Sequence, residues 1–305
     1  MSRDAGSGQW ASMAEIGSAW GLDFLYWTYR LLGRWPFRAA LAPVVAYFLL
    51  FSGVQRRASA DFLRKAGIRG PLAPAVARHF WSFSEALLDK VIAWKGGIRL
   101  EDTVFEGREP VQALLDRGRG FLLVGSHLGN LEVSRVLSRQ RPGLAVHVLV
   151  HNSHAENFNR LLRRLDPTAG VNLVQVAGFG PGQAAWVAER IGKGEVVLIA
   201  GDRTPVGGGR TLDVEFLGSP AAFAQGPFVM AAALGCPVFL MFCLKESGRF
   251  RIVYEPFASG LQLPRAGREE ALRQVVVRYA SRLEHYCRLA PYQWFNFYPF
   301  WSSQA

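Results

Sequence analysis

The chain divides into two parts that differ in the pattern of their hydrophobic and polar positions. Residues 20–54 are apolar almost throughout. After about residue 104, short β-branched runs alternate with segments of helical periodicity, which is typical of an α/β domain. We therefore predict a disordered N-terminus over residues 1–9, hydrophobic membrane-docking helices over residues 10–70 and an α/β domain over residues 71–305.

The α/β domain is predicted to have a central mixed, mostly parallel sheet flanked by helices. A helical pattern over Pro71–Trp94 precedes the sheet. The expected strands are Phe121–Gly125, Ala145–Val150, Asn172–Val176, Val196–Ala200, Leu212–Phe216, Val238–Leu244 and Phe250–Glu255. The expected helices lie near Pro110–Arg117, Asn130–Arg139, Ala155–Leu165, Pro181–Ile191, Gln225–Leu234 and Gly267–Arg288.

The uncharged run Ala39–Val54 is the most membrane-like part of the chain. Its 16 residues fall short of the about 20 that a membrane-spanning helix needs. Arginines lie on both sides of it, so the positive-inside rule gives no crossing direction. We predict that two N-terminal helices dock onto, or dip into, the cytoplasmic face of a bilayer. A single true span and a pair of core helices of a soluble protein remain alternatives.

The net charge narrows the classes of molecule that could bind this protein. The net charge of +11 favours an anionic partner, either an acidic protein or anionic lipid. The basic residues are scattered, and neither zinc-finger spacing nor an RNA-binding aromatic signature is present, so nucleic acid is not expected.

Cys236, Cys243 and Cys287 form no CxxC pair and lie in apolar surroundings. They are therefore expected to be buried, reduced thiols.

The segment Gly125–Glu132, GSHLGNLE, contains the strongest catalytic candidates. His127 follows a continuously apolar strand, and catalytic groups of open α/β sheets lie at the carboxyl ends of strands. On one continuous helix, His127 and Glu132 would point about 140° apart. They can pair only if the chain turns at Leu128–Gly129 and Glu132 lies in the first helical turn.

Such a pair would make His127 a general base. A carboxylate beside an imidazole fixes the tautomer of the ring and stabilises the imidazolium that forms when the ring takes a proton. Glu132 would stay ionised because it would lie near the positive N-terminus of a helix. Since the sequence contains no serine or cysteine nucleophile motif, direct attack by an acceptor hydroxyl is the simplest reaction.

Two blocks of the sequence resemble a known family. GSHLGNLE resembles the HxxxxE/D block of the lysophospholipid acyltransferase superfamily, and most of all the late acyltransferases of lipid A biosynthesis. Gly201–Pro205 and then Val214–Pro220 are similar to an Asp-containing turn and an apolar loop of that family, which precede a helix and a buried strand, here Gly226–Phe242. The basic, hydrophobic N-terminal segment is a third match, so the resemblance covers nearly the whole chain.

The resemblance implies a role for each candidate residue in the first block. His127 would be the general base and Glu132 its partner. Asn130 would support the turn between them, and asparagine is also a good helix N-cap.

The second block and a helix between the two blocks would bind the substrates. Asp202 and Arg203 would line the second wall of the site, where Arg203 could hold a phosphate or the pantetheine arm of a carrier protein. Arg160, in the segment NFNRLLRRL, lies where the family often has an arginine that binds a phosphate or an oxyanion.

The implied function is transfer of a fatty acyl chain from acyl carrier protein to a hydroxyl of a lipid or glycolipid at the cytoplasmic face of the inner membrane. No metal or redox cofactor is expected, and the +11 charge suits an acidic carrier and anionic headgroups. The family commonly has Asp-Gln where this chain has Asp202-Arg203. The tail QWFNFYPFW resembles the subgroup associated with aryl polyene lipids, so a lipid A-like acceptor and an aryl polyene lipid both stay open.

Two functions of other classes compete with this interpretation. His147, His151 and His154 lie close together and could form a metal site with His127 and Asp202, which would indicate a metal-dependent hydrolase. No HExxH motif supports that site. A non-enzymatic membrane-associated scaffold would account for the charge and the apolar N-terminal part, but not for a histidine and a carboxylate at a strand-to-helix junction.

Overall fold

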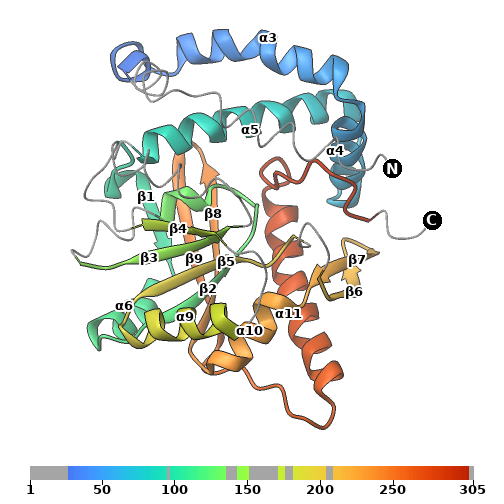
Figure 1. Ribbon diagram of the computed structural model, residues 1–305. Helices are drawn as coiled ribbons and strands as arrows, with labels where there is room; N and C mark the ends of the chain where they lie inside the picture. The colour runs from blue at the N-terminus through green and yellow to red at the C-terminus, as the bar shows by residue number, and fades with distance from the viewer. Residues whose placement is uncertain are drawn as a thin grey trace.

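The structure, a computed structural model, describes residues 27–94, 97–134, 143–150, 171–175, 181–203 and 209–301. A seven-stranded sheet forms its centre, with helices around it (Figure 1). The strand order is β1-β9-β8-β2-β5-β3-β4. The strands are β1 (Thr103–Glu106), β2 (Phe121–Gly125), β3 (Val146–Val150), β4 (Val171–Gln175), β5 (Val196–Ala200), β8 (Val238–Glu246) and β9 (Arg249–Ala258).

The sheet is mixed and mostly parallel, as predicted. Every neighbouring pair is parallel except β8 and β9, which form an antiparallel hairpin. β2 lies between β5 and β8, and all five of its residues are buried. A strand covered on both faces reads as a continuous apolar run rather than an alternating one, which explains the sequence FLLVG.

Alternate residues of β2 enter two different cores. Phe121 and Leu123 pack with the first core, which α5 (Leu72–Trp94) and α6 (Arg108–Asp116) help to form. Leu122 and Val124 face the second core. Three more helices contribute to that core, namely α9 (Pro181–Gly192), α10 (Gly226–Leu234) and α11 (Arg268–Leu289).

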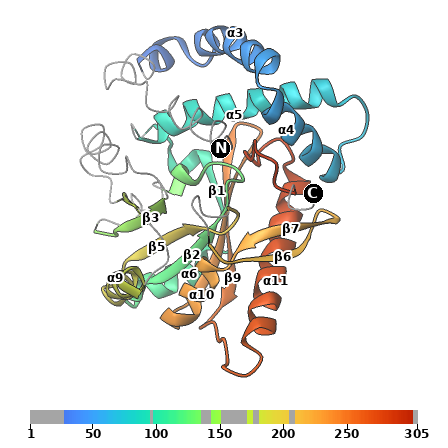
Figure 2. The ribbon, with the colours of Figure 1, turned by 45° about the vertical axis from the view of Figure 1, so that its right-hand side comes forward.

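The buried residues of α11 have the spacing of an amphipathic helix. Its buried side chains recur every three or four residues, so they share one face. These buried residues include Leu272, Val276, Tyr279, Leu283 and Tyr286. A separate two-stranded sheet, β6 (Thr211–Phe216) and β7 (Ser219–Ala224), lies beside α11 (Figure 2).

Helices α3 (Trp35–Phe51), α4 (Gly53–Lys65) and α5 make up the N-terminal part, and α3 lies above α5 in Figure 1. The apolar run ends in a sharp corner at Ser52, where α3 and α4 meet with a bend of 92°. In the part of the chain that the structure describes, no single helix is long and apolar enough to cross a membrane. α3 and α4 together have the length and the apolar composition of a membrane span, but they are bent sharply between them.

Ion pairs hold α3 onto the rest of the molecule. The buried carboxylate of Asp89 on α5 accepts from Arg34 Nη2 at 2.5 Å and from Lys245 Nζ of β8 at 2.5 Å. Arg38 Nε pairs with Glu85 Oε1 at 2.5 Å. These contacts fix the position of α3 over α5.

Some elements differ from the predicted ones. α4, β1 and β7 were not predicted, because α4 is largely polar and the two strands are short or rich in small residues. Of the helix expected over Asn130–Arg139, the described part contains a 3-10 helix, η2 (Leu131–Ser134). The helix expected over Ala155–Leu165 lies outside the described residues. The three cysteines are free and buried, as predicted.

Candidate active site

His127 lies immediately beyond β2 and is hydrogen-bonded twice to one carboxylate. Its ring atom Nδ1 is 2.8 Å from Asp202 Oδ1, and its backbone N–H donates to Asp202 Oδ2 at 2.7 Å. Because a carboxylate accepts, the proton of the neutral ring is on Nδ1 and Nε2 carries the lone pair. The side chain of His127 is 31% exposed, whereas that of Asp202 is 1% exposed.

Neighbouring parallel strands bring these two residues together. Asp202 follows β5, whose residue Ala200 is in register with Gly125 of β2. The N–H of Gly201 donates to the carbonyl of Gly125 at 2.9 Å, which extends the pairing beyond the strands. The carboxyl ends of two adjacent strands therefore form the His127–Asp202 pair, at the edge where α/β sheets bind ligands.

Trp294 supplies a third donor to the same carboxylate. Its indole Nε1 donates to Asp202 Oδ2 at 2.9 Å, and its side chain is completely buried. Burial acts to raise the pKa of Asp202, but the charge of His127 and the hydrogen bonds from His127 and Trp294 outweigh it and hold the pKa below its usual value. Asp202 is thus ionised at neutral pH.

The surroundings also keep the imidazole neutral. Burial, followed by the nearby Arg203 guanidinium, lowers the pKa of His127 below its ordinary value, and Asp202 offsets part of this effect. Among the described residues, Nε2 has no hydrogen-bond partner. A neutral imidazole with one nitrogen fixed on a carboxylate and the other free can act as a general base.

The C-terminal tail holds the turn that follows His127. The N–H of Phe295 donates to the carbonyl of His127 at 3.0 Å, and the N–H of Gly129 donates to Gln293 at 2.7 Å. Gly129 has a φ of +75°, a conformation that favours glycine. The aromatic tail therefore shapes the turn after His127 as well as contributing Trp294.

Asn130, which the resemblance places in support of the turn, forms two hydrogen bonds there. Its Oδ1 accepts from the N–H of Glu132 at 3.3 Å, and its Nδ2 donates to the carbonyl of Ala86 on α5 at 3.2 Å. His127 precedes η2 and Glu132 lies within it, as the predicted turn at Leu128–Gly129 requires. The pairing of His127 with Glu132 stays a prediction, since the hydrogen bond of Nδ1 goes to Asp202.

The structure describes one of the two candidate arginines, Arg203. Arg203 is exposed next to the pair, with Nη2 3.5 Å from the carbonyl of Phe295 and its guanidinium 5.9 Å from the ring centre of Tyr298. Arg160 lies outside the described residues.

Sequence reasoning missed Trp294 and the contact between Asp202 and His127. The signal for Trp294 was present, because a tail with no periodicity but many aromatic residues must pack somewhere.

Replacing Arg203 with alanine is expected to move the acid limb of the kcat/KM pH profile to higher pH. Removing the guanidinium takes away a positive charge that disfavours protonation of His127, so the pKa of the base rises. The measurement is kcat/KM across pH 4.5–8 (a window of about two units around an ordinary histidine pKa). Arg203→Lys keeps the charge and should retain the wild-type profile; an unshifted acid limb in Arg203→Ala contradicts the assignment.

A second buried histidine, His79, connects α4 to Trp294. Its Nε2 donates to the carbonyl of Trp294 at 3.0 Å, and its Nδ1 accepts from Ser59 Oγ at 2.8 Å. Since a carbonyl can only accept, Nε2 carries the proton of the neutral ring. Burial lowers the pKa of His79 from 6.5 to about 4, and its bond to Trp294 offsets this in part.

His79 is expected to make the protein less stable as the pH falls below 6.5. The unfolded chain protonates this histidine near pH 6.5, but the folded chain does so only near pH 4, so the unfolded state binds more protons between these values. The loss of unfolding free energy should reach about 3 kcal/mol at pH 4. Urea unfolding at pH 7 and pH 4 measures it. His79→Gln, which still donates to Trp294, should lose correspondingly less, and an equal loss in both proteins refutes the assignment.

Of the three additional histidines of the alternative metal site, the structure describes His147 alone. His147 Nε2 lies 2.7 Å from Glu195 Oε2, in a mostly buried contact between β3 and the start of β5. His151 and His154 lie outside the described residues. In the described ranges, no group of three His, Cys, Asp or Glu side chains is placed to hold a metal ion.

A comparison with protein-family models gives a match over the part of the chain that contains the sheet and the site. The family model for bacterial lipid A biosynthesis acyltransferase matches residues 79–303, which is more than two thirds of the chain. The match includes both blocks that meet at the His127–Asp202 pair, and also Trp294. A search of curated proteins finds no match. The chain is therefore an acyltransferase that belongs to the bacterial lipid A biosynthesis acyltransferase family.

Proposed function

We propose that this acyltransferase transfers a fatty acyl chain from acyl carrier protein to a hydroxyl of a lipid or glycolipid acceptor, with His127 as the general base. The observation that supports the mechanism is the buried Asp202 carboxylate on Nδ1 of His127, which leaves Nε2 as the basic nitrogen of a partly exposed side chain. Asp202 takes the place that the sequence suggested for Glu132.

The reaction requires one proton transfer in each direction. The acceptor hydroxyl gives its proton to Nε2 while its oxygen attacks the thioester carbonyl. Asp202 stabilises the imidazolium. When the tetrahedral intermediate collapses, the C–S bond breaks and the departing pantetheine sulfur takes the proton from Nε2, which restores the neutral base. No metal or redox cofactor takes part.

Arg203 is the described cation best placed to bind an anionic group. It is exposed beside His127 and lowers the pKa of the ring, so it lies close enough to act on charge in the site. A guanidinium there would stabilise the oxyanion or hold the pantetheine phosphate. Arg160 is the other candidate from the sequence.

The N-terminal helices would place the enzyme on the cytoplasmic face of the inner membrane. Nine of the twelve large apolar side chains that are exposed in the described part of the chain lie between Trp27 and Val54. A contiguous exposed apolar surface marks a protein or membrane interface. The +11 charge would add attraction to anionic lipids and to an acidic carrier.

The test combines purified enzyme, acyl-loaded carrier protein and candidate acceptors in lipid vesicles. The expected result is one free carrier thiol per acylated lipid, with the lipid heavier by one acyl group in mass spectrometry. His127→Ala should abolish both products, whereas His285→Ala, an exposed histidine on α11, should behave as wild type. Comparing the amounts of acylated product formed from a lipid A precursor and from an aryl polyene lipid would identify the acceptor. Thiol release without acylated lipid, in the presence of both acceptors, contradicts acyl transfer.

A further inference from the structure

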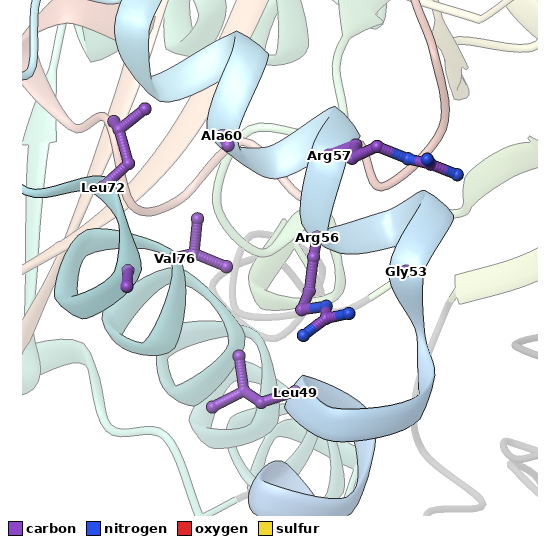
Figure 3. Close-up of a pocket in the computed structure, with 8 residues that line it drawn as sticks. Leu49, Gly53, Arg56, Arg57, Ala60, Leu72 and Val76 are labelled. Carbon is purple, nitrogen blue, oxygen red and sulfur yellow. The ribbon is translucent and has the colours of Figure 1, made fainter.

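A groove of 560 Å³ lies in the N-terminal part of the molecule, between the end of α3, α4 and the start of α5 (Figure 3). Its size falls within the range of about 300–1,000 Å³ that is typical of ligand pockets. The residues around it are Leu49, Gly53, Arg56, Arg57, Ala60, Leu72, Ala73 and Val76.

The lining of this groove suits a hydrocarbon chain. Apart from two arginines, every side chain that lines it is apolar or absent. A peptide segment would leave its backbone N–H and C=O groups without partners there, which costs free energy, whereas an alkyl chain has no polar groups to satisfy. The groove also lies among the exposed apolar residues of α3, next to the surface proposed to meet the membrane.

Arg56 provides a cation at the mouth of the groove. In Figure 3 its side chain extends across the space between the helices, while Arg57 points away from that space. The guanidinium of Arg56 stays near Gly53, since Nη2 would lie 3.8 Å from a Cβ at position 53.

Three other basic residues of the N-terminal part have partners, whereas Arg56 and Arg57 form no ion pair with the residues that the structure describes. Arg34 and Arg38 are paired with carboxylates of α5. Lys65 donates to Ser219. Among the described residues, neither Arg56 nor Arg57 forms an ion pair. Arg56 is therefore available for an anion, and guanidinium groups bind phosphate well.

The groove is separate from the catalytic site. Val76 at the groove and Ala86 beside Asn130 are ten residues apart on α5, which corresponds to about 15 Å along the helix. The groove therefore lies at a different position along α5 from the turn that follows His127.

We propose that this groove binds an acyl chain of an anionic membrane phospholipid, with Arg56 paired to the headgroup phosphate. The proposal rests on the membrane association proposed above, but not on the acyl transfer reaction. An acyl chain there would fill the space between α3, α4 and α5. Since Ser59 of α4 is hydrogen-bonded to His79 of α5, the bound lipid would stabilise the helix pair that supports Trp294.

The experiment measures binding of monomeric dioctanoyl phosphatidylglycerol by native mass spectrometry and by the shift in melting temperature. Ala60→Trp, which fills the groove, should abolish binding, while the variant keeps its fold by circular dichroism and still floats with anionic vesicles. Arg56→Ala should weaken binding about tenfold or more, as expected for a hydrogen-bonded charge pair. Arg57→Ala removes the same charge one residue away and should change it less than about threefold.

Dioctanoylglycerol, which has the same chains without a phosphate, separates the two parts of the site. It should bind more weakly than the phospholipid, and Arg56→Ala should leave its binding unchanged. Unchanged phospholipid binding in Ala60→Trp overturns the proposal, and so does equal weakening by Arg56→Ala and Arg57→Ala. Acyl transfer is measured separately with His127→Ala, so either proposal can fail without the other.

Discussion

Asp202→Asn is expected to lower kcat by about 1,000- to 10,000-fold while the protein stays folded. Asp202 accepts three hydrogen bonds, two on Oδ2 from the His127 N–H and the Trp294 indole, and one on Oδ1 from Nδ1 of His127. An asparagine has only one acceptor oxygen. If that oxygen takes the place of Oδ2, the amide NH2 faces Nδ1, which must then accept. The proton moves to Nε2, and the imidazole can no longer act as a base.

Glu132→Gln is the matched control, because it makes the same carboxylate-to-amide change at the other candidate. With Asp202 as the partner of His127, this variant should keep activity within about tenfold of wild type. Both are measured as kcat at saturating carrier and acceptor, with melting temperatures recorded alongside. A loss in Glu132→Gln that matches or exceeds that in Asp202→Asn would return the role of partner to Glu132.

The local half of the site could be predicted from the sequence, whereas the resemblance placed Asp202 in the wall of the site without pairing it with His127, and nothing placed Trp294 there. β2, the turn after it and the position of His127 follow from a continuous apolar run that ends in Ser-His-Leu-Gly. Asp202 is 75 residues from His127, and Trp294 is a further 92 residues on. No periodicity connects positions so far apart. The parallel pairing of β2 with β5 brings the first two together, and packing of the tail adds the third.

The N-terminal helices show a different limit. The apolar run over 39–54 contains no charged residue, and its composition alone favours one element. The structure divides the run at Ser52, because the polar sequence of α4 buries Phe62 and Leu63 in the core and turns away from α3. The surface proposed to meet the membrane is thus one side of a bent helix pair, and the groove beside Arg56 lies at the bend.

Gly129→Ala is expected to be the most destabilising single-methyl addition in the catalytic turn. A Cβ at Gly129 would lie 1.8 Å from the backbone oxygen of Cys243 in β8, so the backbone must move. The φ of +75° adds about 1–2 kcal/mol for a residue with a side chain. We expect a loss of about 4 kcal/mol or more in unfolding free energy, with kcat reduced at least tenfold because His127 shifts with the turn.

Gly218→Ala separates the clash from the cost of the conformation. Gly218 has the same φ of +75°, but nothing lies within 4 Å of a Cβ placed there. This variant should lose only about 1–2 kcal/mol and keep full activity. Thermal and urea unfolding of both proteins give the comparison. If Gly129→Ala is no less stable than Gly218→Ala, the contact between the turn and β8 does not fix the position of His127, and a different element must hold His127 against Asp202.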